Sequence, residues 1–202
     1  LSLSGFYQRN LFITSSHYIF SYDSIKRPLK GLVFTSLLFL YACAVKPQSD
    51  LDNPEYHHKA GMRHIESGKF QESLTAFRRA VDLDKKFAPA YAGMGIAYAN
   101  LEDRKKAKKF AGKAEGLGSK DPDVLMLCAR VWIDLRHQEK KWFKPAEKLL
   151  KKALKRKKNH EGATYYKGEL YLYQYMFSEA EDQFRAVVEM KGDYSGKADK
   201  MW

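Results

Sequence analysis

The chain has 202 residues, 45% of them hydrophobic, and its 36 Lys and Arg outnumber its 24 Asp and Glu to give a formal charge of +12. This length and composition suffice for one hydrophobic core with appendages. Cys43 and Cys128 lie far apart, and His57, His58 and His64 lack zinc-ligand spacing, so the pattern argues against a disulfide framework and a zinc site.

The first recognisable segment has the composition of an export signal. Lys26, Arg27 and Lys30 precede the uncharged apolar residues 31–42. Even when it is extended to Val45, the apolar stretch is shorter than the roughly 20 residues that a membrane-spanning helix needs. We therefore expect a secretory signal rather than a transmembrane helix.

The apolar segment ends in Leu40, Tyr41, Ala42 and Cys43, which resembles the lipobox of bacterial lipoprotein precursors, although Tyr41 stands where a small or β-branched residue is usual. The resemblance implies that the Cys43 thiol receives a diacylglycerol, that the chain is cut before Cys43, and that fatty acids such as palmitate anchor the protein stably. Ala44, in place of Asp, implies an outer-membrane lipoprotein facing the periplasm or the cell surface. The alternatives are an ordinary cleaved signal peptide or an uncleaved short anchor.

The segments before and after the signal are expected to lie outside the folded domain. Residues 1–24 lie upstream of any sensible signal start, and we expect them to be an over-extended gene start. Residues 1–43 are therefore assigned to this extension and the signal peptide. Residues 44–53, which are short and polar and contain a proline, are expected to be a flexible tether.

The remainder of the chain contains a repeated spacing. Gly61 and Gly95 lie 34 residues apart, and a third match begins at Gly168. The same four offsets from each glycine, 3, 12, 16 and 19, hold residues of similar type. From Gly61 they are His64, Ser73, Phe77 and Ala80. From Gly95 they are Tyr98, Ala107, Ala111 and Ala114, and from Gly168 they are Tyr171, Ala180, Phe184 and Val187. This spacing resembles the tetratricopeptide repeat, in which each unit is a pair of antiparallel helices. The resemblance implies an all-α, right-handed solenoid of helix pairs.

Helix-start signals agree with this division. Asn53 before Pro54 and Asp121 before Pro122 each place a capping residue ahead of a proline at the first helical position. Gly68 is expected at the turn between the two helices of the first unit. The four expected units are 54–87, 88–121, 122–160 with five extra residues, and 161–194.

In the resembled family the first helices line a concave groove that binds a segment of another protein. The groove residues expected by offset are His58, Met62, Ile65, Ala92, Ile96, Ala99, Met126, Arg130, Ile133, Tyr165, Glu169 and Leu172. This set is mostly apolar, which suits an amphipathic helix or an extended partner segment. The alternative is that these residues pack against a capping helix. Five tyrosines of the last unit are expected to fill the core and the groove: Tyr165, Tyr166, Tyr171, Tyr173 and Tyr175.

A basic patch is expected in the third unit, where residues 136–158 hold eleven Lys or Arg against only Glu139 and Glu147. Its members are Lys140, Lys141, Lys144, Lys148, Lys151, Lys152, Lys155 and Arg156. Because an exported domain does not meet nucleic acid, an anionic lipid or an acidic partner is the expected ligand. The alternative is a solvated outer face.

The sequence contains no recognisable nucleophile and base pair, phosphate-binding glycine loop or metal motif. We therefore expect a protein-binding module of the cell envelope, not an enzyme, with no cofactor other than the lipid on Cys43 and no metal. Residues 195–202 are expected to begin a further helix. The alternative function is a scaffold segment of a larger surface-associated protein whose activity lies beyond Trp202.

Overall fold

The computed structural model describes residues 52–201, and this part of the chain consists of helices without any strand. The helices are α2 (Pro54–Glu66), α3 (Phe70–Leu83), α4 (Ala88–Asn100), α5 (Arg104–Leu117), α6 (Pro122–Asp134), α7 (Phe143–Arg156), α8 (Glu161–Leu172), α9 (Phe177–Met190) and α10 (Ser195–Ala198), with short 3₁₀ helices at Leu135–His137 and Asp199–Met201. None of these helices is long and apolar enough to cross a membrane. The predicted signal segment and Cys43 lie outside the described residues.

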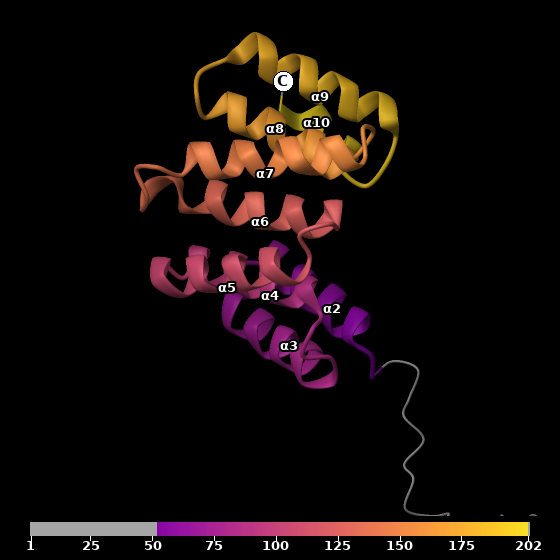
Figure 1. Cartoon of the computed structure of the whole chain (residues 1–202). Coiled ribbons are helices and arrows are strands. Elements are labelled where there is room, and N and C mark those ends of the chain that lie inside the picture. Colours follow the sequence, from indigo (N-terminus) through magenta and orange to yellow (C-terminus); the bar gives the residue numbers. More distant parts are fainter. Residues whose placement is uncertain (1–51, 202) are drawn as a thin grey trace, which may run out of the picture. The chain divides into compact units, whose positions relative to one another are not determined.

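The helices form four antiparallel pairs that stack in chain order, α2 with α3, α4 with α5, α6 with α7 and α8 with α9 (Figure 1). The second helix of each pair packs against the first helix of the next pair, and successive first helices also contact one another. The predicted all-helical array of helix pairs is confirmed for the described residues. The turns within pairs lie along one edge of the array and the loops between pairs along the opposite edge.

Two predicted helix starts are confirmed by their capping hydrogen bonds. The Asn53 side chain accepts a hydrogen bond from the Tyr56 amide at 2.7 Å, and the Asp121 side chain accepts one from the Asp123 amide at 2.9 Å. A third cap was not predicted, because it uses a ring nitrogen: His160 Nδ1 accepts from the Ala163 amide at 3.3 Å at the start of α8. Each cap satisfies a backbone donor that the helix itself leaves unpaired.

The turns within three of the pairs contain a residue with left-handed backbone at the same repeat position. These residues are Gly68, Glu102 and Tyr175, with φ angles of 71°, 61° and 62°. The predicted place of Gly68 in the first turn is confirmed. Left-handed backbone suits glycine because it has no Cβ, so the two other residues carry a steric cost.

The third pair has no such turn, because its five extra residues build a longer connection between α6 and α7. We call residues 135–142 the α6–α7 connection. Its Trp142 is buried and packs edge-on against Tyr173, with ring centroids 6.4 Å apart. The insertion therefore joins the third pair to the fourth.

Candidate functional site

Most of the predicted groove residues are buried between neighbouring helices, which corrects the expectation of an apolar groove. Buried members of that set are Ile65, Ala92, Ile96, Ala99, Met126, Ile133 and Tyr165. For Ala92, Ile96 and Ala99 the cause is the composition of α4, which is rich in alanine and glycine and lets α2 and α6 approach it closely. Ile96, for example, has 0% of its surface exposed, so it has no surface to offer a partner.

The remaining predicted groove residues are half-buried and reach solvent on the face lined by the first helices, which we call the inner face. They are His58, Met62, Arg130, Glu169 and Leu172. The accessible part of the inner face is therefore more polar than predicted, and its charged members come from α6 and α8.

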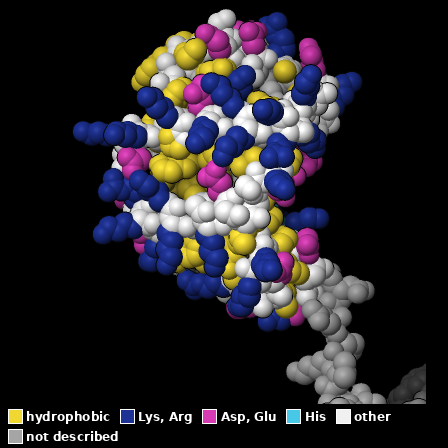
Figure 2. All heavy atoms as spheres, in the orientation of Figure 1, with side chains coloured by type: hydrophobic (Ala, Val, Ile, Leu, Met, Phe, Trp, Pro, Cys, Tyr) yellow, Lys and Arg dark blue, Asp and Glu magenta, His cyan; other side chains and the backbone are white. Residues whose placement is uncertain are grey.

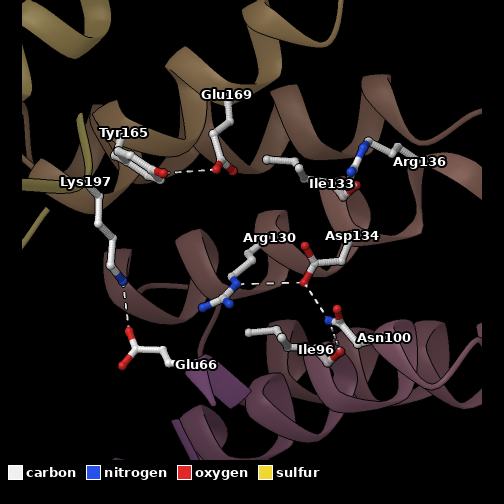
Figure 3. Close-up of polar contacts among 10 residues, drawn as sticks. All are labelled: Glu66, Ile96, Asn100, Arg130, Ile133, Asp134, Arg136, Tyr165, Glu169 and Lys197. Carbon is white, nitrogen blue, oxygen red and sulfur yellow. Dashed lines mark hydrogen bonds and ion pairs between the residues drawn. The ribbon is translucent and has the colours of Figure 1, made fainter. Parts of the chain in front are cut away.

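A group of polar side chains from three successive first helices meets on the inner face (Figure 3). Asn100 of α4 donates to Asp134 Oδ2 of α6 at 3.2 Å, and Arg130 Nε lies 3.8 Å from the same oxygen. On α8, the Tyr165 hydroxyl donates to Glu169 Oε1 at 3.1 Å. We call these five residues the inner-face cluster.

Burial shifts the pKa values of the charged residues in the inner-face cluster. Loss of water raises the pKa of Asp134 and of Glu169 above their ordinary values, although Arg130 and hydrogen bonds lower both in part. Burial alone would lower the pKa of Arg130, but the oxygens of Tyr166 and Asp134 raise it overall. The cluster thus combines a positively charged guanidinium with two carboxyl groups whose ionised forms have lost much of their hydration.

The Arg130 guanidinium has hydrogen-bonding capacity to spare. Its Nε contacts Asp134, whereas within residues 52–201 neither Nη atom donates a hydrogen bond. The side chain remains 17% exposed, so an acceptor from outside can reach it. A guanidinium with two free nitrogens is suited to bind a carboxylate or a carbonyl oxygen.

One ion pair links the two ends of the array beside this cluster. Lys197 Nζ, which follows the last pair, lies 2.8 Å from Glu66 Oε1 at the end of α2 (Figure 3). Tyr194 packs against the rings of Tyr165 and Tyr166 at 5.2 and 5.8 Å. The C-terminal segment therefore covers part of the inner face, as the capping-helix alternative anticipated.

The predicted basic patch lies mainly on the outer side of α7, and all its members except the half-buried Lys152 are exposed. Lys151 pairs with Glu147 at 2.7 Å, and Lys152 pairs with Glu115 of α5 at 2.9 Å. A shallow hollow of about 720 Å³ opens there, lined by Ser119, Lys120, Lys152, Lys155 and Arg156. The patch is therefore an open surface, and Glu147 and Glu115 neutralise part of its charge.

The basic surface is wider than predicted, because α5 contributes to it. Residues 104–117 contain six Lys or Arg and one carboxylate, Glu115. Figure 2 shows dark blue side chains along both α5 and α7, with hydrophobic atoms between them. The repeated Lys-Lys pairs in α5 were the signal in the sequence that could have revealed this extension.

An exposed hydrophobic turn was also missed. Tyr165 and Tyr166 are buried, and Tyr171 and Tyr173 are half-buried, as core and groove fillers should be. Tyr175 is instead 81% exposed in the turn between α8 and α9, which corrects the prediction for this tyrosine. The helical pattern that predicted its burial stops at Leu172, where α8 ends.

No group of three or more His, Cys, Asp or Glu side chains that could hold a metal ion occurs within residues 52–201. Cys128 is a free thiol buried in α6.

Comparison with known proteins identifies the first helix pair most directly. A family model described as tetratricopeptide repeat matches residues 54–87, which hold α2 and α3. No curated protein sequence matches the chain.

Several solved structures are similar in outline at low sequence identity. A structure of MamA is 18% identical over 84% of this chain and 92% of its own, with a TM-score of 0.46. MamA 41-end from Desulfovibrio magneticus RS-1 is 16% identical over 80% and 86%, with a TM-score of 0.47. YrrB, titled a TPR protein with an unusual peptide-binding site, is 24% identical over 76% and 74%, with a TM-score of 0.43. The family match over residues 54–87 supports the predicted tetratricopeptide resemblance for the first helix pair.

Proposed function

We propose that the array is a scaffold that binds a segment of another protein at the inner-face cluster, with Arg130 as the main contact. The observation that carries this proposal is the half-buried guanidinium of Arg130, whose two Nη atoms donate no hydrogen bond within residues 52–201. A partner carboxylate or backbone carbonyl would satisfy these donors. Half-buried Met62 and Leu172 would contact apolar side chains of the same segment.

The cellular setting belongs to the same proposal. Lipid on Cys43 would hold the scaffold at the cell envelope as an outer-membrane lipoprotein, where the partner would be another envelope protein. The support is the resemblance of residues 40–43 to a lipobox. An anionic lipid or an acidic protein at the basic patch would be a second contact, supported by the exposed cations of α7.

Affinity capture from solubilised envelopes tests the binding proposal. We expect Arg130→Gln to lose partners that wild type recovers, since glutamine keeps the polar character but lacks the charge and three of the five N–H donors. Arg185→Gln is the matched control, because Arg185 is exposed on α9, a second helix that lies away from the inner face and outside the basic patch. Equal recovery by Arg130→Gln and wild type would contradict the proposal.

The anchor is tested separately by metabolic labelling. Cys43→Ala should abolish incorporation of labelled fatty acid and release the protein into the soluble fraction. Persistent labelling of this variant would show that the lipidation site was misassigned.

A further inference from the structure

The two most exposed large hydrophobic side chains of the described residues, Tyr175 and Phe177, lie in one turn. Tyr175, Met176 and Phe177 are 81%, 38% and 62% exposed, and we call them the aromatic turn. Only two other large hydrophobic residues of the described part, Tyr56 and Leu117, are exposed, and each lies in a different helix. A contiguous exposed hydrophobic patch marks an interaction surface more often than scattered exposure does.

Neither packing nor backbone conformation explains the tyrosine in this turn. Tyr175 adopts the same left-handed conformation as Gly68 and Glu102 in the first two pairs. A residue with a Cβ there has a steric cost that glycine avoids. The side chain recovers little of this cost through burial, because it contacts mainly the exposed ring of Phe177, at 6.2 Å. The turn itself therefore has no need of an aromatic residue at this position.

The base of the aromatic turn adjoins the α6–α7 connection. A hollow of about 250 Å³ lies between them, lined by Arg136, His137, Trp142, Leu172, Tyr173 and Tyr175. The Arg136 guanidinium lies 4.2 Å from the centroid of the Tyr173 ring and fixes this junction. The aromatic turn and the α6–α7 connection thus form one continuous edge.

The same edge carries positive charge. Lys140 and Lys141 of the α6–α7 connection and Lys144 at the start of α7 are exposed and form no ion pair within residues 52–201. Glu139, the carboxylate of this connection, is already paired with Lys108 of α5 at 2.8 Å. Unpaired cations therefore lie on the side of the hydrophobic turn that adjoins the α6–α7 connection, whereas exposed Glu179 lies on its α9 side.

We propose that this edge contacts the surface of a bilayer that contains anionic lipid, with Tyr175, Met176 and Phe177 at the level of the headgroups. Aromatic side chains favour the membrane interface, and lysines near an anionic leaflet are attracted to it. The aromatic side chains protrude from a turn, and the adjoining hollow is too small for a helix. A fluid surface can close around such side chains, whereas a rigid partner would need a matching cavity.

This contact rests on the proposed anionic-lipid contact of the basic patch, to which Lys140, Lys141 and Lys144 belong, but not on partner binding at Arg130. If this edge contacts a bilayer, the inner face, which is lined by the first helices, stays accessible to a protein partner. The contact would also orient the array, because the loops between pairs lie along the opposite edge and would point away from the membrane.

The test places a tryptophan in the turn of the full chain, reconstituted in vesicles of equal parts phosphatidylcholine and phosphatidylglycerol. Brominated lipid quenches tryptophan fluorescence by contact. The fluorescence of the new tryptophan is the difference between Phe177→Trp and wild type. We expect brominated lipid to reduce this difference by about one-half or more, because the ring lies at the membrane interface. Thr75→Trp is the control, because Thr75 is also exposed but lies within α3 of the first pair, away from both the turn and the basic patch. Equal quenching of the two variants, or none in either, would overturn the proposal.

A charge reversal tests the role of the lysines. Lys140→Glu with Lys141→Glu, added to Phe177→Trp, should reduce the quenching severalfold. The same reversal at exposed Lys157 and Lys158, beyond the other end of α7, should leave it unchanged. Equal effects of the two reversals would overturn the specific contact. A blue shift of the Phe177→Trp fluorescence on adding polyglutamate, with none on adding vesicles, would overturn the membrane contact and would indicate an acidic protein instead. Because the reporter is in the turn, its result is independent of labelling at Cys43 and of partner capture by Arg130.

Discussion

The Phe77 ring of α3 fills the space that the missing side chain of Gly61 leaves in α2. A Cβ built on Gly61 would fall 2.5 Å from Phe77 Cε1, far inside van der Waals contact, and Phe77 has 0% of its surface exposed. We predict that Gly61→Ala destabilises the protein by about 2 kcal/mol, because overpacking a closed core outweighs the better helix propensity of alanine. Thermal or urea unfolding measures this effect.

Gly112 provides the matched control for Gly61. It lies inside α5, and a Cβ on it would meet no atom within 4 Å. Gly112→Ala should therefore stabilise the protein by up to about 1 kcal/mol. If both substitutions changed stability in the same direction, the close approach of α2 and α3 at Gly61 would not be the determining factor.

His58 should make the stability of the array depend on pH. Its ring packs against Phe77 and Phe87 at 5.8 and 5.9 Å, its Nε2 is buried without a hydrogen-bond partner, and burial lowers its pKa from 6.5 to about 4. Between these values the unfolded chain binds a proton that the folded chain does not, so stability falls as pH falls from about 6.5 to about 4. The expected loss is about 2–3 kcal/mol.

Urea unfolding at several pH values tests the role of His58. In His58→Leu this part of the pH dependence should disappear, whereas the exposed His137→Gln should retain it. A wild-type stability that is constant across this pH window would refute the role assigned to His58.

Cys128 should resist alkylation in the folded protein. Its thiol is buried, its Sγ donates to the Ala111 carbonyl oxygen at 3.5 Å, and burial raises its pKa to about 12. Since the thiolate is the reactive form, iodoacetamide at pH 8 should modify native Cys128 about a thousandfold more slowly than the unfolded chain. Mass spectrometry of a Cys43→Ala background, which leaves Cys128 as the single thiol, measures both rates. Comparable rates would contradict the burial of this side chain.

Asp134 should contribute more to stability than an exposed aspartate does. It accepts a hydrogen bond from Asn100, which lies 34 residues earlier at the same repeat position, and it partly neutralises Arg130. Asp134→Ala leaves both partners uncompensated and should cost about 2 kcal/mol. Asp82→Ala, which removes an exposed partner of Lys85, should change stability by less than about 0.5 kcal/mol. Similar effects of the two substitutions would show that the inner-face cluster is not a stabilising unit.

The helix starts were predictable because their signals are local. A capping side chain and a proline act within one turn, so Asn53 with Pro54 and Asp121 with Pro122 identify α2 and α6 from the sequence alone. Pairs of residues 16 positions apart, such as Gly61 with Phe77 and Gly168 with Phe184, also meet as the repeat spacing implies. These contacts depend on the geometry of a single helix pair, which one repeat already contains.

The accessibility of the inner face was not predictable in the same way. An offset within a repeat gives the direction of a side chain, but burial depends on how closely the neighbouring pairs approach. Ile96 points as predicted and is still enclosed, because the small residues of α4 bring α2 and α6 close to it. Tyr175 differs from its prediction in the opposite direction. Continued helical spacing would bury this side chain, but α8 ends before it and the turn exposes it.

The ion pair between Glu66 and Lys197 changes how the array can come apart. Stacked repeats without long-range contacts lose their terminal units independently, because each unit interacts only with its neighbours. Here a contact across 131 residues connects the two outermost parts. Because both side chains are about half exposed, the pair contributes at most about 1 kcal/mol, so it makes separation of either terminal unit only slightly less favourable than in an array whose ends do not touch.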